Sequence, residues 1–360
     1  MKTAQREAGA VLNEMADRLA GEVTDRQYEQ QPELVNRFGP LGRLRTRQDS
    51  LYHLRYLAES VTMDSPLLFI QYISWLRTLL IQYKVTDEDL LINLFLIRDA
   101  LVQSVEEPHL KLLLSYLDMG IHQVNKKEHP LPFIRPGQPY SGEAAEYLEH
   151  LLSGRRREAS TLAVGLYDQG VPIRDIYMHI FQASQYEIGR LWQTGEITVA
   201  QEHYCTACTQ SIISQLYPYW IKAPMQEKGT LVASGVGEEL HEIGLRMVAD
   251  FFEMEGWNTY HLGANMPEAA LIRFLADKRA DVVAISATMT YNVNLVARLI
   301  ERIRSAEETR NVKILVGGLP FNIDRELWFK IGADGYAPDA QGAIEAAERL
   351  TGRDYEIQPL

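Results

Sequence analysis

His241 is the residue of this sequence with the best setting for binding a metal. Glu239 lies two residues before it, and a carboxylate at that spacing can accept a hydrogen bond from one ring nitrogen while the other nitrogen faces a metal. Gly244 leaves room for a ligand chain where a side chain would obstruct it. Taken alone the pattern is weak, because a solvated histidine at the start of a helix gives the same spacing.

Three further segments of unusual composition also follow predicted strands. Ser286 and Thr288 offer small hydroxyl groups, Gly317 with Gly318 permits close backbone approach, and residues 336–339 follow the last strand. Parallel sheets receive ligands at the carboxyl ends of their strands. Together with the His241 loop, these segments favour a site for a long, narrow group between strands and helices.

The strands that position these segments begin after Lys228, where the sequence pattern changes. Short runs rich in β-branched residues alternate with helical stretches, and the runs lie at 231–235, 259–262, 281–286, 312–316 and 335–337. Five such strand–helix units predict a flavodoxin-like, doubly wound parallel α/β sheet (Rossmann-like) over residues 228–350.

Two helical regions precede this sheet. Residues 1–50 predict one amphipathic helix followed by irregular chain, and 51–124 repeat apolar residues at helical intervals, so 1–124 should form an all-α domain. Four prolines between 125 and 142 predict an extended linker. Helical segments at 143–153, 155–169, 172–193 and 198–216, the last closed by Pro218, predict a four-helix bundle over 143–224.

The bundle contains two groups of side chains that could carry chemistry. Trp192 and the pair Glu202 and His203 lie on consecutive helices and can project to one side, although a core tryptophan beside a half-exposed polar pair is the ordinary explanation. Cys205 and Cys208 have the C-x-x-C spacing of a redox or metal pair. Both fall within a helical pattern without a second ligand pair, which favours buried core residues.

The composition argues against nucleic acid and membranes as partners. The net charge is −12, and no stripe of Lys and Arg offsets repulsion by phosphates. No run of about eighteen apolar residues occurs, which a membrane span would need. We therefore expect a cytoplasmic protein.

Residues 228–350 resemble the cobalamin-binding domain shared by methionine synthase, corrinoid methyl carriers and B12-dependent photoreceptors. The family pattern D-x-H-x-x-G, S-x-T or S-x-L, and G-G is matched at 239–244, 286–288 and 317–318, with Glu239 in place of the usual aspartate. The resemblance implies a cobalamin cofactor whose cobalt has His241 as its lower axial ligand and whose nucleotide tail is buried in the sheet.

The spacing W-x9-E-H of Trp192, Glu202 and His203 is similar to the cap over cobalamin in B12-dependent photoreceptors. That resemblance implies adenosylcobalamin, with Trp192 packed on the adenosyl group, Glu202 bonded to its polar atoms and His203 beside them. The chain departs from the light-dependent repressors of that family in two ways. Gln193 replaces the histidine that captures cobalt after photolysis, and the N-terminal region has no recognition helix for DNA.

The order of a helical domain, a proline-rich linker, a cap and a cobalamin domain resembles photocobilins, in which a degenerate globin-like domain holds a bilin. His53, Arg55 and Tyr56 supply groups suited to a tetrapyrrole with propionates, such as biliverdin. The alternative is a partly exposed helix on which Leu54 and Leu57 pack inward.

These resemblances imply a non-enzymatic light sensor that is a homo-oligomer. Photolysis of the cobalt–carbon bond would change its conformation or assembly, and this change would signal to an unidentified downstream protein. The alternative function is a corrinoid carrier protein of a methyltransferase system. An adenosylcobalamin mutase is disfavoured, because no substrate barrel of roughly 200 residues or more is present in this sequence.

Overall fold

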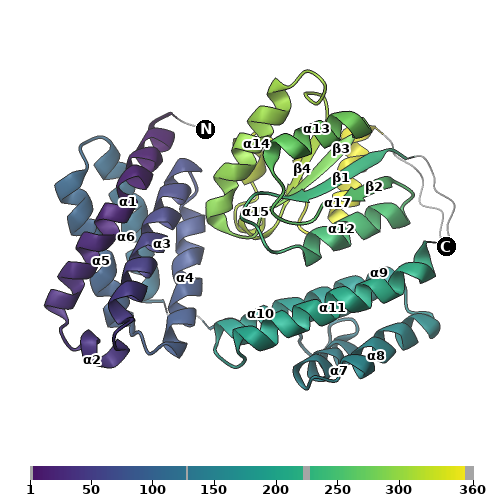
Figure 1. Cartoon of the computed structure of the whole chain (residues 1–360), viewed down its shortest axis with the longest axis horizontal. Helices are drawn as coiled ribbons and strands as arrows, with labels where there is room; N and C mark the ends of the chain where they lie inside the picture. The colour runs from purple at the N-terminus through teal and green to yellow at the C-terminus, as the bar shows by residue number, and fades with distance from the viewer. Residues whose placement is uncertain (1–2, 127–128, 222–227, 353–360) are drawn as a thin grey trace.

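The computed structural model describes residues 3–126, 129–221 and 228–352 and contains three parts: an N-terminal helical bundle, a helical cap and a five-stranded sheet domain (Figure 1). The sheet domain lies against both of the others. Among the described residues, none of the helices is long and apolar enough to cross a membrane.

The N-terminal bundle consists of α1 (Thr3–Gln30), α2 (Leu34–Phe38), α3 (Gly42–Thr62), α4 (Pro66–Gln82), α5 (Asp87–Ser104) and α6 (His109–Val124). The irregular chain predicted before residue 51 is wrong, because α3 begins at Gly42, directly after a turn at Gly39 with a positive φ of 66°. Most of the residues from Arg43 to Gln48 are exposed, so this first part of α3 lacks the apolar repeat that marks a helix in a sequence. Thr86 starts α5 and forms a capping box with Asp89.

The cap consists of α7 (Ser141–Leu152), α8 (Arg156–Asp168), α9 (Ile173–Asp175), the π-helical turn η1 (Ile176–Gln182), α10 (Ala183–Gln193) and α11 (Val199–Trp220). Helices α9, η1 and α10 follow one another without a break. Pro218 lies inside α11 rather than ending it, since a proline so near the last turn removes only one backbone hydrogen bond. Cys205 and Cys208 are buried in α11 as free thiols, as the helical pattern predicts.

The sheet domain has the strand order β2-β1-β3-β4-β5, and all neighbouring strands are parallel. This is the doubly wound order expected from the sequence. The strands are β1 (Thr230–Gly235), β2 (Asn258–His261), β3 (Val282–Ser286), β4 (Lys313–Gly317) and β5 (Gly335–Tyr336). The helices are α12 (Ile243–Met254), α13 (Glu268–Lys278), η2 (Thr290–Asn292), α14 (Val293–Ser305), α15 (Leu319–Ile323), α16 (Leu327–Lys330) and α17 (Ala340–Thr351).

Side chains alternate between the two faces of the sheet and join different cores. Leu231 and Ala233 belong to a core with α12, α17 and the cap, whereas Val232 belongs to a core with α13 and α14. The first of these cores is continuous from the sheet into the cap helices. The cap is therefore packed onto the α12 and α17 side of the sheet domain, as Figure 1 shows.

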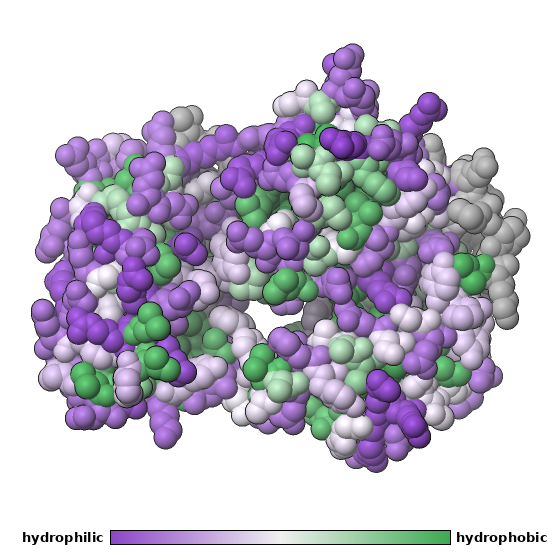
Figure 2. All heavy atoms as spheres, in the orientation of Figure 1, coloured by the Kyte–Doolittle hydropathy of each residue, from purple (hydrophilic) through white to green (hydrophobic). Residues whose placement is uncertain are grey.

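The N-terminal bundle contacts both other parts. Met63 and Leu68, at the junction of α3 and α4, are fully buried in the core on the α14 side of the sheet. On the cap side, the Gln193 Nε2 donates to the backbone oxygen of Trp75 at 2.9 Å, and the Trp75 and Trp192 rings lie 6.1 Å apart. The three parts thus form a closed arrangement around a central hollow (Figure 2).

Candidate functional site

His241 lies in the loop between β1 and α12, and its ring is held from one side by Glu239. The Glu239 Oε1 accepts a hydrogen bond from His241 Nδ1 at 2.5 Å and from the backbone N of both Leu240 and His241 at 3.1 Å. The Glu239 side chain is fully buried, whereas that of His241 is 59% exposed. The Nε2 of His241 is therefore the ring nitrogen left to face a ligand. The extra methylene of glutamate over aspartate does not prevent the contact.

The other carboxylate oxygen of Glu239 is held by the segment after β3. The Glu239 Oε2 accepts from the backbone N of Thr288 at 2.6 Å, from that of Met289 at 3.3 Å and from Asn292 Nδ2 at 3.3 Å. Both oxygens are thus fixed, one by the His241 loop and one by residues 288–292. The orientation of the imidazole depends on both segments.

The charges follow from these contacts. Burial opposes ionisation of Glu239, but hydrogen bonds from His241 and from the backbone of Thr288 outweigh it and lower the pKa of the carboxyl group to about 2. The bond to Glu239 in turn raises the pKa of His241. A carboxylate on Nδ1 makes Nε2 a stronger donor to a metal. Nε2 of His241 is therefore the atom that would hold the cobalt of a bound corrin.

The ends of the three central strands lie at one level and carry small residues. Gly235 pairs with Ser286, and Ser286 pairs with Gly317, across β1, β3 and β4. Gly318 has a φ of 106°, and a Cβ built on it would lie 2.0 Å from the backbone oxygen of Ala287. This position therefore requires glycine. Around Gly244 a Cβ would meet no atom within 4 Å, so the entrance beside His241 is open.

In the cap, Glu202 lies in the first turn of α11. Its negative charge contributes to the raised pKa of His241. Glu202 is hydrogen-bonded to His203, whose side chain is 75% exposed, and to Thr206 Oγ1 at 3.1 Å. The helix α11 thus presents polar atoms to the site.

Trp192 is half-buried at the end of α10, where it contacts Trp75 of the N-terminal bundle. Gln82 Nε2 also donates to the backbone oxygen of Trp192 at 3.3 Å. The neighbouring Gln193 is directed to the bundle by its bond to the Trp75 carbonyl. Trp192 therefore lies at the junction of cap and bundle.

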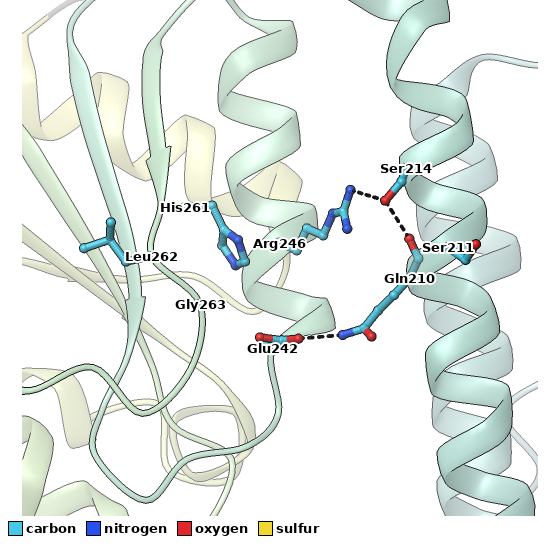
Figure 3. A pocket seen from close by; sticks show the side chains of 8 residues that line it. All are labelled: Gln210, Ser211, Ser214, Glu242, Arg246, His261, Leu262 and Gly263. Carbon is cyan, nitrogen blue, oxygen red and sulfur yellow. Dashed lines mark hydrogen bonds between the residues drawn. The ribbon is translucent and has the colours of Figure 1, made fainter.

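A cavity of about 470 Å³ opens between α11 and the sheet domain (Figure 3). Gln210 Nε2 bonds Glu242 Oε1 at 2.7 Å across it, and Arg246 bonds Ser214 Oγ at 3.0 Å. The complete lining is Gln210, Ser211, Ser214, Glu242, Arg246, His261, Leu262 and Gly263. These donors and acceptors fit the peripheral amide groups of a corrin.

Apart from Glu242 in the loop 239–244, the lining residues were not predicted from the sequence. His261 ends β2, and Leu262 and Gly263 follow it, so the rule that ligands bind at strand ends could have found them. Gln210 and Ser214 could not be found in that way. They are ordinary polar positions on a helix, and only the packing of α11 against α12 brings them to the site.

The predicted bilin contacts are separated in the structure. His53 is 3% exposed and its Nδ1 lies 2.7 Å from the Tyr72 hydroxyl oxygen, and burial lowers the pKa of His53 to about 3. Tyr56 is also buried and stacks on Tyr72 with ring centroids 3.7 Å apart. Arg55 is exposed. The first two residues are thus packed inside the bundle, and the third lies on its surface.

Comparison with known proteins places both the cap and the sheet in cobalamin-binding families. Residues 229–346 match a family described as B12 binding domain, and residues 143–217 match a second family with the same description. These two segments therefore form a cobalamin-binding module.

Two curated relatives are corrinoid proteins. The chain is 27% identical to a corrinoid protein of Desulfitobacterium hafniense over 46% of this chain and 77% of that protein. It is 29% identical to the trimethylamine corrinoid protein of Methanosarcina barkeri over 46% of this chain and 76% of the other. The solved monomethylamine corrinoid protein of Methanosarcina barkeri matches with a TM-score of 0.52 and 21% identity, covering 59% of this chain and 99% of that structure. It shares the fold of the matched region.

Proposed function

We propose that this protein is a corrinoid carrier of a methyltransferase system. It binds cobalamin between cap and sheet, and separate methyltransferases donate and accept the methyl group. The observation that carries the proposal is the buried Glu239 that fixes His241 with one ring nitrogen directed outward. The named corrinoid relatives support it independently. In this proposal the chain acts as the carrier, and the separate methyltransferases supply the catalytic residues.

The parts of the module have distinct roles in this proposal. His241, oriented by Glu239, would hold the cobalt through its Nε2. Ser286, Thr288, Gly317 and Gly318 line the entry of the nucleotide tail between strands and helices. Bound cobalamin supplies a cobalt centre that takes up and releases a methyl group.

The upper face belongs to the cap. Trp192, Glu202 and His203 are its proposed contacts, and the charge of Glu202 contributes to the raised pKa of His241. The polar atoms of α11 that line the cavity would bind amide groups of the corrin.

The lower ligand is tested by substituting His241. The chain loaded with hydroxocobalamin should show the spectrum of histidine-bound cobalamin, and His241→Ala should lose it. His261→Ala is the matched control, because it removes a second strand-end histidine that lines the cavity but is not the proposed ligand. An unchanged spectrum and affinity in His241→Ala would remove the assignment.

A light sensor containing adenosylcobalamin is the second candidate. The contact between Trp192 and Trp75 favours it, since a shift of the cap on loss of the adenosyl group would reach the N-terminal bundle directly. Alkylcobalamins are cleaved by light in any setting, so the discriminating measurement is size. The adenosyl-loaded chain should be compared by sedimentation in darkness and after green light. A change of assembly after light supports the sensor, and an unchanged size supports the carrier.

The carrier also requires access to cobalt in darkness. The reduced, cobalamin-loaded chain should react with methyl iodide at a rate comparable to that of free reduced cobalamin. A cap that prevents this reaction would contradict the carrier.

A globin-like fold of the bundle and a biliverdin site in it stay predictions. A pigment would have to replace the contacts of His53 and Tyr56 with Tyr72 or bind at exposed Arg55. Incubation with biliverdin tests the site, and absence of a red-absorbing complex would refute it. A homo-oligomer and a downstream signalling protein also stay predictions tied to the sensor.

A further inference from the structure

The segment 288–292 connects the proposed cobalt ligand to the N-terminal bundle. Its backbone at Thr288 and Met289 and the side chain of Asn292 all donate to the Glu239 carboxylate. The segment includes the 3-10 turn η2 and leads directly into α14. The position of Glu239, and through it that of His241, therefore depends on where this segment lies.

The same segment is packed into the bundle. Met289 and Tyr291 lie against the apolar core formed by the bundle helices. The Tyr291 ring meets the Tyr56 ring edge-on, with centroids 5.6 Å apart and an interplanar angle of 90°. Tyr56 is 7% exposed and is itself fixed by stacking on Tyr72. An edge-to-face aromatic pair of this kind adds a directional contact to ordinary burial.

The start of α14 is held by the bundle as well. The Glu59 Oε1 accepts a hydrogen bond at 2.6 Å from the backbone N of Asn294, in the first turn of α14. The bundle thus holds the segment at two points, by Tyr291 within it and by the helix start that follows it.

We propose that the N-terminal bundle positions His241 for cobalt, with Tyr291 and Tyr56 as the positioning residues. The inference rests on the proposed binding of cobalamin through His241 and extends it to a part of the chain outside the cobalamin-binding families, whose matches begin at residue 143. A change in the bundle would reach the metal through Tyr291, segment 288–292, Glu239 and His241, in that order.

The test uses the full chain loaded with hydroxocobalamin and reduced to the Co(II) state. With 15N-labelled histidine in the chain, a histidine nitrogen on cobalt splits each cobalt line in electron paramagnetic resonance into two, whereas the dimethylbenzimidazole nitrogen of the cofactor itself splits each line into three. The two-line splitting therefore reports His241, and a chain without that ligand lacks it. Tyr291→Ala should lose most of the splitting and bind hydroxocobalamin about tenfold more weakly, the lower end of what loss of an outer-shell partner costs at a metal site. Tyr291→Phe keeps the edge contact and should retain the wild-type spectrum.

Two further variants distinguish a specific loss of His241 positioning from a general loss of structure at the interface. Tyr56→Ala changes only the bundle, so the same loss of splitting in this variant supports the proposal even if Tyr291→Ala does not fold. Arg6→Ala is the control, because Arg6 bonds Glu301 at 2.9 Å in the same interface but away from segment 288–292. It should leave the splitting unchanged.

The outcomes distinguish this inference from the proposed function. Folded Tyr291→Ala and Tyr56→Ala chains with full splitting and wild-type affinity overturn the positioning role and leave the carrier intact. Loss of splitting in Arg6→Ala as well would also overturn it, because the effect would then come from the interface as a whole. A wild-type chain without the splitting refutes His241 as the ligand and thus the proposed function itself.

Discussion

Because of Glu59, the free energy of unfolding of this protein should decrease as the pH rises from weakly acidic to weakly basic values. Its side chain is 4% exposed, in the contact between α3 and the start of α14. Burial raises the pKa of the carboxyl group to about 8, although the Asn294 amide and the charge of Arg298 oppose the rise. At neutral pH the folded chain therefore holds Glu59 mainly in its neutral form.

The sign and size of the effect follow from proton linkage. The ordinary pKa of the carboxyl group is 4.5, so between that pH and about pH 8 the folded chain binds a proton that the unfolded chain has lost. The contribution to the free energy of unfolding is complete below pH 4.5 and is lost as pH rises through 8. The slope is about 1.4 kcal/mol per pH unit, so the loss from about pH 6 to about pH 8 is about 2 kcal/mol.

Glu59→Gln tests this reasoning because glutamine resembles the neutral acid and keeps an oxygen that can accept from the Asn294 amide. Urea unfolding should be followed by far-UV circular dichroism at pH 6 and pH 8. From pH 6 to pH 8 the free energy of unfolding should decrease by about 2 kcal/mol more in the wild type than in the variant, since other titrating groups affect both equally. Glu301→Gln, at the exposed ion pair with Arg6, should follow the wild type. Parallel changes in the wild type and Glu59→Gln would refute the raised pKa.

Three further predictions concern other parts of the molecule. Gly318→Ala should destabilise the sheet domain by about 1–3 kcal/mol in thermal unfolding, because a Cβ there meets a backbone oxygen at 2.0 Å. The control Gly317→Ala, whose nearest contact would be at 3.2 Å, should destabilise it less, and equal losses of stability would contradict the argument. Glu239→Gln should weaken cobalamin affinity about 10–100-fold in a titration, because the neutral amide no longer makes His241 a strong donor; wild-type affinity would show that the charge is dispensable. Thr198→Ala removes the capping box of α11 and should lower stability by about 1 kcal/mol in urea unfolding, a prediction that an unchanged midpoint would contradict.

The site in the sheet domain was predictable because its positions follow from chain order and strand direction. Once five strand–helix units are recognised, the ends of parallel strands must meet at one edge. Gly235, Ser286 and Gly317 lie side by side there for that reason. The contact of Glu239 with His241 is also local, since only one residue separates them.

The contacts between the three parts were not predictable, because an apolar repeat tells which face of a helix is buried but not what covers it. Met63 and Leu68 fit the apolar pattern of a helical bundle, yet they are buried in the core of the sheet domain. Trp75 packs against the core of its own bundle, but it also contacts Trp192 of the cap. Glu59 gave no signal at all, since a glutamate on a helix is ordinarily exposed.

The closed arrangement of bundle, cap and sheet has a consequence for the kinetics of cofactor loading. A two-part module can open like a hinge at its single interface, but here the cap is joined to the sheet by a shared core and to the bundle by Gln193 and Trp192. If the cap moves away from the sheet to admit a large ligand, at least one of these joints has to separate for a time. We therefore expect slow uptake and equally slow release of cobalamin, with a lifetime of the complex set by the opening of the joints more than by affinity.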